Sequence, residues 1–519
     1  MSSKIVAFVA FQEQPNLGIG YLSSVLMDAG YSVEVIDFQL GRERVLQELQ
    51  RIRPLLVGFS IIFQYHLERF GDLIGYLREK GVGGHFTAGG HYPSLRPAEI
   101  FESVPDLNSI VLFEGEHTCL ELVEALAAGG DWRQIRGIAH LEDGSVTQNS
   151  LRDLERDLDR FPPPLRPPLR DFVLGKKHAT LLAGRGCVYD CSFCSIRRFY
   201  SAPPGPVKRL RSPNLVAREM ELLREEMNCS IFMFQDDDFP VARPHGKQWA
   251  LEFCRHLREK GLADKILWKV NCRPDEVDPA LFSEMQDCGL FLVYLGIESG
   301  TDEGLRLMNK RVNVARVLRG VDTLKDLGIH FDYGFMLFDP SSTCESIRRN
   351  LDFLEQIVGD GSAPVTFCKM RPYAETRIEA ELREQGRLVG PRGREDYEFP
   401  DDAVNELYSV LLHSFDEWIG ERDGVLNLAK WVRYYLSAFG RFAQSDGQLA
   451  SLEARARAIV AESNGFALDQ VRGACDWLET GGASFELFRR AHRATHRAHE
   501  GFQKQLRDLI RDVKLARAA

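Results

Sequence analysis

Short apolar runs alternate with longer amphipathic stretches over the first 140 residues of the chain. Apolar runs of four to eight residues, separated by helical spacing, are typical of strands buried on both faces. The pattern predicts a parallel, doubly wound sheet of the Rossmann type, which binds ligands at the carboxyl ends of its strands. The expected strands are residues 6–11, 31–38, 55–62, 84–89 and 109–113.

A second β/α series follows a stretch, residues 161–170, that contains five prolines and cannot form regular structure. Six β/α units predict a partial barrel of the TIM type, with its chemistry at the carboxyl ends of the strands. Its expected strands are residues 180–184, 230–235, 267–272, 290–297, 331–337 and 365–370. Long helices dominate after about residue 390. We therefore expect four segments: 1–140, a linker at 141–175, a barrel at 176–385 and a helical domain at 386–519.

Composition narrows the class of protein. The formal net charge of −10 does not favour a nucleic-acid partner. No run approaches the length of apolar residues that a membrane span needs, and the N-terminus lacks the features of a signal peptide, so we expect a cytoplasmic protein. Eight of the eleven cysteines are scattered singly, as expected for small buried apolar residues in a reducing compartment.

The other three cysteines, Cys187, Cys191 and Cys194, stand within eight residues directly after the first strand of the second series. Three thiolates on one loop can hold one side of an iron–sulfur cube and leave one iron open. A structural zinc site is the alternative, but it needs four protein ligands, and the neighbouring sequence has no further Cys or His pair. The spacing therefore favours a cluster.

With Phe193, these cysteines match the motif C-x-x-x-C-x-aromatic-C, and the chain here resembles the radical S-adenosylmethionine superfamily. The resemblance implies a [4Fe-4S] cluster whose open iron binds S-adenosylmethionine, which one electron then cleaves to methionine and a 5′-deoxyadenosyl radical. It places Phe193 beside the adenine and suggests Arg273 and Glu298 as further S-adenosylmethionine contacts. The alternative for Arg273 and Glu298 is an ordinary salt bridge at a strand end.

Residues 234–239, 295–300 and 371–376 resemble the ends of the second, fourth and sixth barrel strands of that superfamily. The end of the fifth strand, residues 338–343, departs from the usual Gly-aromatic-Pro-Gly-Glu-Thr pattern. The resemblance therefore leaves the adenosine contacts at this strand open.

The N-terminal segment resembles the cobalamin-binding domains that are fused to radical enzymes, through residues 17–22, 29–35, 88–94 and 113–118. Four segments follow predicted strands and meet at one rim: 12–20, 60–64, 89–93 and 114–116. The resemblance implies cobalamin contacts there from Gly18, Ser60, Gly89, Gly90, His91, Glu114, Gly115 and Glu116. The Asp-x-His-x-x-Gly signature that supplies a cobalt ligand is absent, and a solitary histidine such as His91 or His117 is more typical of a loop.

Taken together, the resemblances imply a cobalamin-dependent radical S-adenosylmethionine methyltransferase that acts on carbon in a small molecule through methylcobalamin. Its electron donor would be a flavodoxin or ferredoxin. Two alternatives stay open: a non-methylating radical enzyme that performs rearrangement, cyclisation or aminocarboxypropyl transfer, and a cobalamin-binding regulator. The related tRNA methylthiotransferases carry three further N-terminal cysteines, whereas only Cys119 precedes the motif here.

Overall fold

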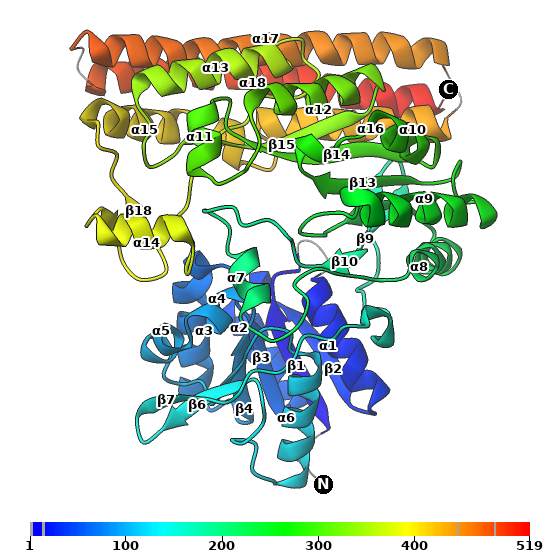
Figure 1. The fold of residues 1–519 in the computed structure, drawn as a ribbon, viewed down its shortest axis with the longest axis vertical. Coiled ribbons are helices and arrows are strands. Elements are labelled where there is room, and N and C mark those ends of the chain that lie inside the picture. The colour runs from blue at the N-terminus through cyan, green and yellow to red at the C-terminus, as the bar shows by residue number, and fades with distance from the viewer. Residues whose placement is uncertain (1–3, 13–15, 444–445, 482–483, 519) are drawn as a thin grey trace. The chain divides into compact units, whose positions relative to one another are not determined.

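The computed structural model describes residues 4–12, 16–443, 446–481 and 484–518. The chain forms two compact units, and each unit is built from three separate segments of the sequence (Figure 1). Unit 1 comprises Met1–Pro168, Gly184–Ser212 and Pro372–Asp396, and unit 2 comprises Leu169–Ala183, Pro213–Arg371 and Tyr397–Ala519. Neither the expected barrel segment nor the expected helical segment therefore coincides with one unit.

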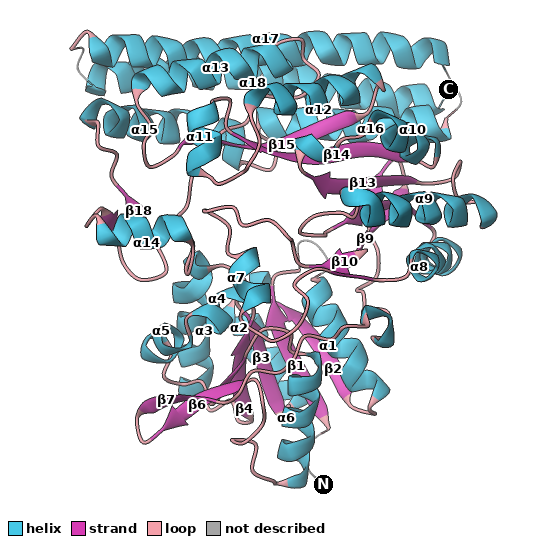
Figure 2. Cartoon of the chain, in the orientation of Figure 1, coloured by secondary structure: helices cyan, strands magenta, loops and turns pink. Residues whose placement is uncertain are grey.

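Unit 1 is built on a seven-stranded sheet of order β2-β1-β3-β4-β5-β6-β7, with helices on both faces (Figure 2). Its first five strands are parallel, as predicted from their continuous apolar runs. Their bounds are β1 (Ile5–Ala10), β2 (Ser32–Asp37), β3 (Leu56–Ser60), β4 (His85–Gly89) and β5 (Ser109–Val111). The helices are α1 (Leu17–Asp28), α2 (Arg42–Ile52), α3 (Leu67–Glu79), α4 (His91–Leu95), α5 (Pro97–Ser103) and α6 (Glu116–Ala128).

At one edge, the sheet continues beyond the predicted parallel strands. Strands β6 (Ile138–Glu142) and β7 (Ser145–Gln148) form a hairpin that continues the sheet antiparallel to β5. The hairpin spans residue 140, where the sequence placed the end of the first domain. Asp143 and Gly144, both at positive φ, form its two-residue turn. Polar residues alternate through β7, which hid the hairpin from a search for apolar runs.

The proline-rich stretch has no regular structure, as predicted, but it packs against α1. The Leu165 amide donates to the Gly20 carbonyl, and the Ser24 hydroxyl donates to the Pro163 carbonyl. A Cβ atom at Gly20 would lie 2.7 Å from the Leu165 carbonyl oxygen, so this helix position requires glycine.

Unit 2 contains the partial barrel, a sheet of order β16-β15-β14-β13-β12-β9-β8. Six of these strands are parallel, as predicted, and β8 (Asp171–Val173) adds an antiparallel edge. The last parallel strand is only two residues long, shorter than expected. The parallel strands are β9 (Lys176–Leu181), β12 (Cys229–Phe234), β13 (Leu267–Cys272), β14 (Leu290–Glu298), β15 (His330–Phe338) and β16 (Cys368–Lys369).

Helices cover the outer face of this sheet and continue into the C-terminal region of unit 2. The connecting helices are α8 (Pro213–Met227), α9 (Arg243–Glu259), α10 (Pro279–Asp287), α11 (Asp302–Leu307), α12 (Val314–Asp326) and α13 (Cys344–Val358). The C-terminal helices are α15 (Asp402–Ser414), α16 (Val425–Phe442), α17 (Asp446–Glu479) and α18 (Ser484–Ala518). Among the described residues, none of the helices combines the length and apolar character needed to span a membrane.

Candidate functional site

The three clustered cysteines lie on one loop of unit 1, between β10 (Gly184–Arg185) and α7 (Ile196–Ser201). All three are half-buried, and the Cys194 amide donates to the Cys191 carbonyl over 3.2 Å, which closes a turn. Strand β10 pairs antiparallel with β11 (Arg209–Leu210). The loop begins at Gly186, whose φ is +82° and whose Cβ position lies 1.9 Å from the Val207 carbonyl oxygen. Only glycine allows the chain to close at this point into the paired strands β10 and β11, which we call the β10–β11 ribbon.

The middle of this cysteine loop is held by another part of unit 1. The Ile378 amide donates to the Ser192 carbonyl over 3.1 Å, and Arg377 pairs with Asp190 at 3.0 Å. After the loop, the ring of Phe199 on α7 lies 4.2 Å from that of His91. The half-buried Phe193 sits in the turn between the last two cysteines. The loop therefore folds with the N-terminal sheet.

The rim of that sheet gathers the residues predicted after its strands. Ser60 and Gly89 end neighbouring strands and are half-buried, and Gly18 is exposed in the first turn of α1. These small residues leave the strand ends open to a broad ligand. Gly90 has a φ of +116°, and its Cβ position lies 2.6 Å from the Ile61 carbonyl oxygen, so the chain's own backbone requires glycine there. Of the first rim segment, residues 13–15 lie outside the described residues.

Glu114 and Glu116, which the resemblance suggests as cobalamin contacts, each contact an arginine of the β10–β11 ribbon. Arg185 pairs with Glu116 at 2.6 Å and with Glu114 at 3.3 Å, and Arg209 donates two hydrogen bonds of 2.8 Å to Glu114. Burial acts to raise the pKa of Glu114, but the hydrogen bonds and charges of Arg209 and Arg185 outweigh it and hold that pKa below its usual value. Gly115 lies between the two glutamates, where a Cβ atom would approach the Val111 side chain to 3.0 Å.

The neighbouring histidines have aromatic or acidic partners. The His91 ring packs against Phe199 at a tilt of 36°, while His117 lies 3.4 Å from Glu155 and against the Phe161 ring.

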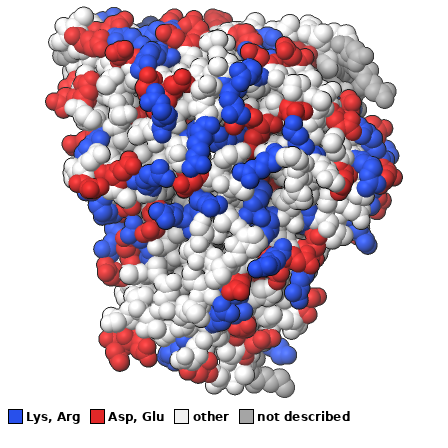
Figure 3. Space-filling model, viewed as in Figure 1, with Lys and Arg blue, Asp and Glu red and all other residues white. Residues whose placement is uncertain are grey.

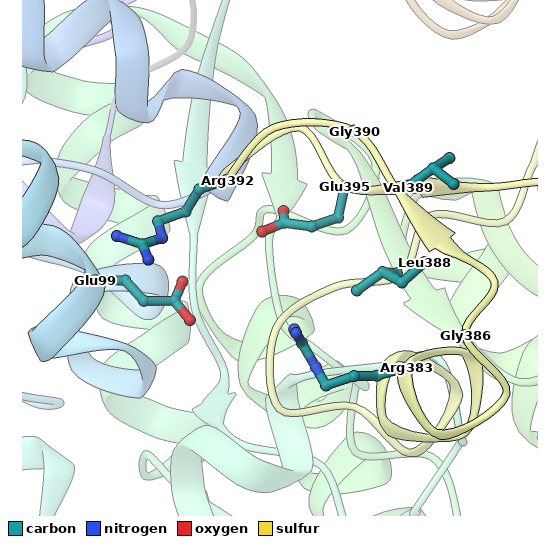
Figure 4. Close-up of a pocket in the computed structure, with 8 residues that line it drawn as sticks. All are labelled: Glu99, Arg383, Gly386, Leu388, Val389, Gly390, Arg392 and Glu395. Atoms are coloured by element: carbon teal, nitrogen blue, oxygen red, sulfur yellow. The ribbon is translucent and has the colours of Figure 1, made fainter.

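Gln64, at the end of the second rim segment, joins the rim to residues 372–396. It accepts from the Ala374 amide over 2.8 Å and donates to the Glu395 carboxylate over 2.9 Å. A pocket of about 300 Å³ lies in this part of unit 1, and Glu99, Arg383, Arg392 and Glu395 point into it (Figure 4). Its two arginines and two glutamates balance in charge.

In unit 2, Arg273 and Glu298 lie near each other at the carboxyl ends of β13 and β14. Lys310 joins them: its carbonyl accepts from the Arg273 guanidinium, and its ammonium lies 3.6 Å from the Glu298 carboxylate. Arg273 also pairs with Asp275 at 2.9 Å. Burial raises the pKa of Glu298, while Lys310 and Arg273 oppose the rise. Glu298 has a φ of +71°, which is strained for a residue with a side chain. Residues with such strained backbone angles cluster at functional sites.

The unusual end of the fifth strand has a structural explanation. Asp339 accepts from the Ser341 amide over 2.8 Å, and the Ser342 hydroxyl accepts from the Asp339 amide over 2.8 Å. Thr343 then caps α13 in a capping box with Ser346. These polar residues therefore turn the chain from β15 into the helix.

Sequence reasoning included Gln64 only as the last residue of a rim segment, and it missed Lys310, Arg185 and Arg209. Lys310 lies twelve residues after Glu298, and nothing in the sequence indicated that the two would be partners. Arg185 stands two residues before the first clustered cysteine, and this proximity was the only available signal. Asp236, in the acidic segment after β12, accepts from the Ala183 amide over 3.0 Å.

Two family models match the chain in the order of its domains. The B12 binding domain matches residues 3–123, and the radical SAM superfamily matches residues 181–354. The first match covers the five parallel strands with the small-residue rim, and the second covers the cysteine loop and the four barrel strands β12 to β15. The chain belongs to the radical S-adenosylmethionine enzymes that carry a cobalamin-binding domain.

An uncharacterized methyltransferase of Pyrococcus horikoshii is 25% identical over 370 residues, which cover 70% of this chain and 77% of that protein. The anaerobic magnesium-protoporphyrin IX monomethyl ester cyclase of Rubrivivax gelatinosus is 27% identical over 350 residues, covering 64% of this chain and 60% of the cyclase. The structure of OxsB, a cobalamin-dependent S-adenosylmethionine radical enzyme, aligns with a TM-score of 0.69 and 19% identity, covering 98% of this chain and 83% of OxsB. This last likeness concerns the fold.

The residues present fit the cofactors of this family. Three half-buried cysteines on one constrained loop supply the thiolates that an iron–sulfur cube needs. Within the described residues, no three His, Cys, Asp or Glu side chains converge as they would around a single ion. A cube binds each thiolate at a different iron, so its ligands need no such convergence. At the rim, Gly18, Ser60 and Gly89 leave the strand ends accessible.

Proposed function

We propose that this enzyme transfers a methyl group from S-adenosylmethionine, by way of cobalamin, to a carbon atom of a small molecule. The supporting observation is that the cysteine loop folds in one unit with the rim of the cobalamin-binding domain. Buried ion pairs from Arg185 and Arg209 to Glu114 and Glu116 hold the loop against that rim. This arrangement suits an enzyme that uses both cofactors in one reaction.

Each cofactor would be held by residues already described. Cys187, Cys191 and Cys194 would bind the cluster, and Gly18, Ser60, Gly89 and His91 would face cobalamin. When bound, these groups supply one-electron cleavage of S-adenosylmethionine and a transferable methyl group. The chain's own part is to orient the substrates and exclude water. Phe193 would lie against the adenine, and Arg273, Glu298 and Lys310 would position S-adenosylmethionine through its polar groups.

A single-electron donor is required, and we propose a flavodoxin or ferredoxin in the cytoplasm. A reducing compartment preserves thiolates as cluster ligands. Acidic and basic side chains are interspersed on the face in Figure 3, and the net charge is −10, so the proposal includes no nucleic-acid substrate.

A non-methylating radical reaction is the second candidate. The Rubrivivax gelatinosus relative is named as a cyclase, and the fifth barrel strand ends in an Asx-type turn in place of the family's usual motif. A cyclase-type enzyme would cleave S-adenosylmethionine without transferring its methyl group.

The two reactions leave different products from S-adenosylmethionine. Methyl transfer leaves S-adenosylhomocysteine, whereas reductive cleavage leaves methionine and 5′-deoxyadenosine. We expect the anaerobically reconstituted enzyme, with cobalamin and a chemical reductant, to form both products, measured by mass spectrometry. Formation of 5′-deoxyadenosine with no S-adenosylhomocysteine would reject methylation in favour of the second candidate.

Two controls assign each product to its cofactor. Replacing Cys187, Cys191 and Cys194 together by Ala should remove 5′-deoxyadenosine and the iron content. Enzyme prepared without cobalamin should lose S-adenosylhomocysteine and retain the cluster. If the triple variant kept its iron, the assignment of the cluster ligands would be wrong.

A further inference from the structure

The inner face of the barrel sheet carries a partly exposed side chain at its centre. Tyr294 stands in the middle of β14, paired with Asn271 on β13 and Asp332 on β15, yet it is 36% exposed. Residues two apart along a strand share a face, so Tyr294 shares its face with Gly296. A Cβ atom at Gly334 would lie 2.8 Å from the Tyr294 hydroxyl, so that ring lies over a glycine. Small residues therefore leave this face accessible.

Positive charge is concentrated beside Tyr294. The Lys269 ammonium lies 5.6 Å from the centre of the Tyr294 ring. Lys430 and Arg433 stand one turn apart on α16, and Arg433 reaches β15, where it pairs with the buried Asp332 and donates to the Phe331 carbonyl over 2.5 Å. Three cations thus surround one carboxylate.

Arg433 neutralises Asp332, which leaves the two lysines uncompensated. Among the described residues, none forms an ion pair or a hydrogen bond with the ammonium group of Lys269 or of Lys430. Burial lowers the pKa of both, and Asp332 only partly opposes the effect. Each lysine also lies near Arg433, whose charge acts in the same direction as burial. His330, beside Asp332, adds no further positive charge, since burial lowers its pKa to about 4.

Keeping two unpaired, half-buried ammonium groups near an arginine costs free energy, and a purely structural position is better filled by an apolar side chain. Such groups suit an anionic ligand that supplies the missing negative charge. Lysine binds phosphate and carboxylate oxygens as a point charge.

We propose that Lys269 and Lys430, with Tyr294, form a subsite for an anionic group of the substrate, a phosphate monoester or a carboxylate. This inference rests on the proposed function and specifies its substrate class. Lys269 stands three residues before the end of β13, about 10 Å from the strand end at 3.3 Å per residue. The substrate is then an extended small molecule with its anion deep in the barrel and its reacting part toward the strand ends.

Binding of simple anions to the reconstituted enzyme tests the subsite without the reaction. Inorganic phosphate and succinate are titrated separately by calorimetry, in the absence of S-adenosylmethionine. We expect at least one to bind, with affinity falling about tenfold or more in Lys269→Met and in Lys430→Met. Tighter binding of phosphate would indicate a phosphate monoester as the anionic group, and tighter binding of succinate would indicate a carboxylate. Lys325→Met, which removes a lysine paired with Asp360 at 3.1 Å elsewhere in unit 2, should change nothing.

Thermal melting of the ligand-free variants separates a binding role from a structural one. Because Lys269 and Lys430 are uncompensated, their replacement by Met should leave the melting temperature unchanged or raise it. A lower melting temperature with unchanged anion affinity would overturn the proposal, as would failure of the wild type to bind either anion.

A measurement on the wild-type enzyme tests the subsite even if the lysine variants fail to fold. Bound anion should protect Lys269 and Lys430 from reductive methylation, followed by peptide mass spectrometry, and should leave Lys325 unprotected. Equal labelling with and without phosphate and succinate would overturn the subsite. The proposed function is tested independently, because its test measures the products formed from S-adenosylmethionine and not anion binding.

Discussion

The guanidinium of Arg185 lies 2.6 Å from the carboxylate of Glu116, although the two residues are 69 positions apart in the sequence. Arg185 precedes the first clustered cysteine by two residues, and Glu116 opens α6 at the rim of the cobalamin-binding domain. Glu114 extends the pair by contacting both Arg185 and Arg209. The position of the cysteine loop therefore depends on carboxylates of the N-terminal domain.

Removing these carboxylates should detach the cysteine loop. In a Glu114→Gln, Glu116→Gln variant, Arg185 and Arg209 stay buried without a counter-charge, which typically costs about 3–5 kcal/mol for a broken buried pair. We expect a lower melting temperature and loss of iron after reconstitution, measured by metal analysis. Arg136→Gln breaks an exposed pair with Asp153 in the same unit and should have little effect. Full iron content in the double variant would contradict a positioning role.

The glycine before the first cysteine is subject to two separate constraints. Gly186 has a positive φ, and an added Cβ atom would lie 1.9 Å from the Val207 carbonyl oxygen. Gly186→Ala should therefore prevent closure of the β10–β11 ribbon and abolish cluster assembly. Gly81→Ala is the matched control, because Gly81 has a φ of +75° but open space around its Cβ position. It should cost only about 1–2 kcal/mol of backbone strain and leave the iron content intact. Equal iron in the two variants would rule out the steric explanation.

The sequence predicts the parallel strands and the cysteine loop because both depend on local patterns. Apolar runs identify β1, β3 and β14, and the three cysteines fall within eight residues. The β6–β7 hairpin was missed because its exposed strand carries no apolar run. The ion pairs of Glu114 and Glu116 join residues far apart in sequence, so a carboxylate that anchors the loop could not be distinguished from one that faces a ligand.

Arg273 remains a predicted contact for the carboxylate of S-adenosylmethionine. We expect Arg273→Ala to weaken binding of S-adenosylmethionine to the cluster-loaded enzyme, since a lost charge-assisted hydrogen bond costs about 1.5–3 kcal/mol, or roughly ten- to a hundred-fold in affinity. Asp275→Asn keeps the guanidinium and removes the charge of the Asp275 carboxylate, which lies 2.9 Å from it. Retained affinity in Asp275→Asn would support a direct contact. Equal loss in both variants would indicate that Arg273 acts through the structure around Lys310.

Acid should weaken the N-terminal sheet through His85. This residue begins β4 and is 8% exposed, with its ring nitrogen 2.8 Å from the Ser109 hydroxyl. Burial, with Arg78 and Arg133 nearby, lowers its pKa to about 4. The folded state therefore binds fewer protons than the unfolded state below pH 6.5, and stability present above that pH is lost as the pH falls toward about 4, by at most about 1.4 kcal/mol per pH unit. Hydrogen exchange of the β4 amides, corrected for intrinsic rates, should show a loss of about 2 kcal/mol between pH 7.5 and 5. His85→Gln removes the titrating group and should flatten this dependence, while both proteins should behave alike between pH 7.5 and 8.5. An equally steep acid loss in the variant would assign the effect to other groups.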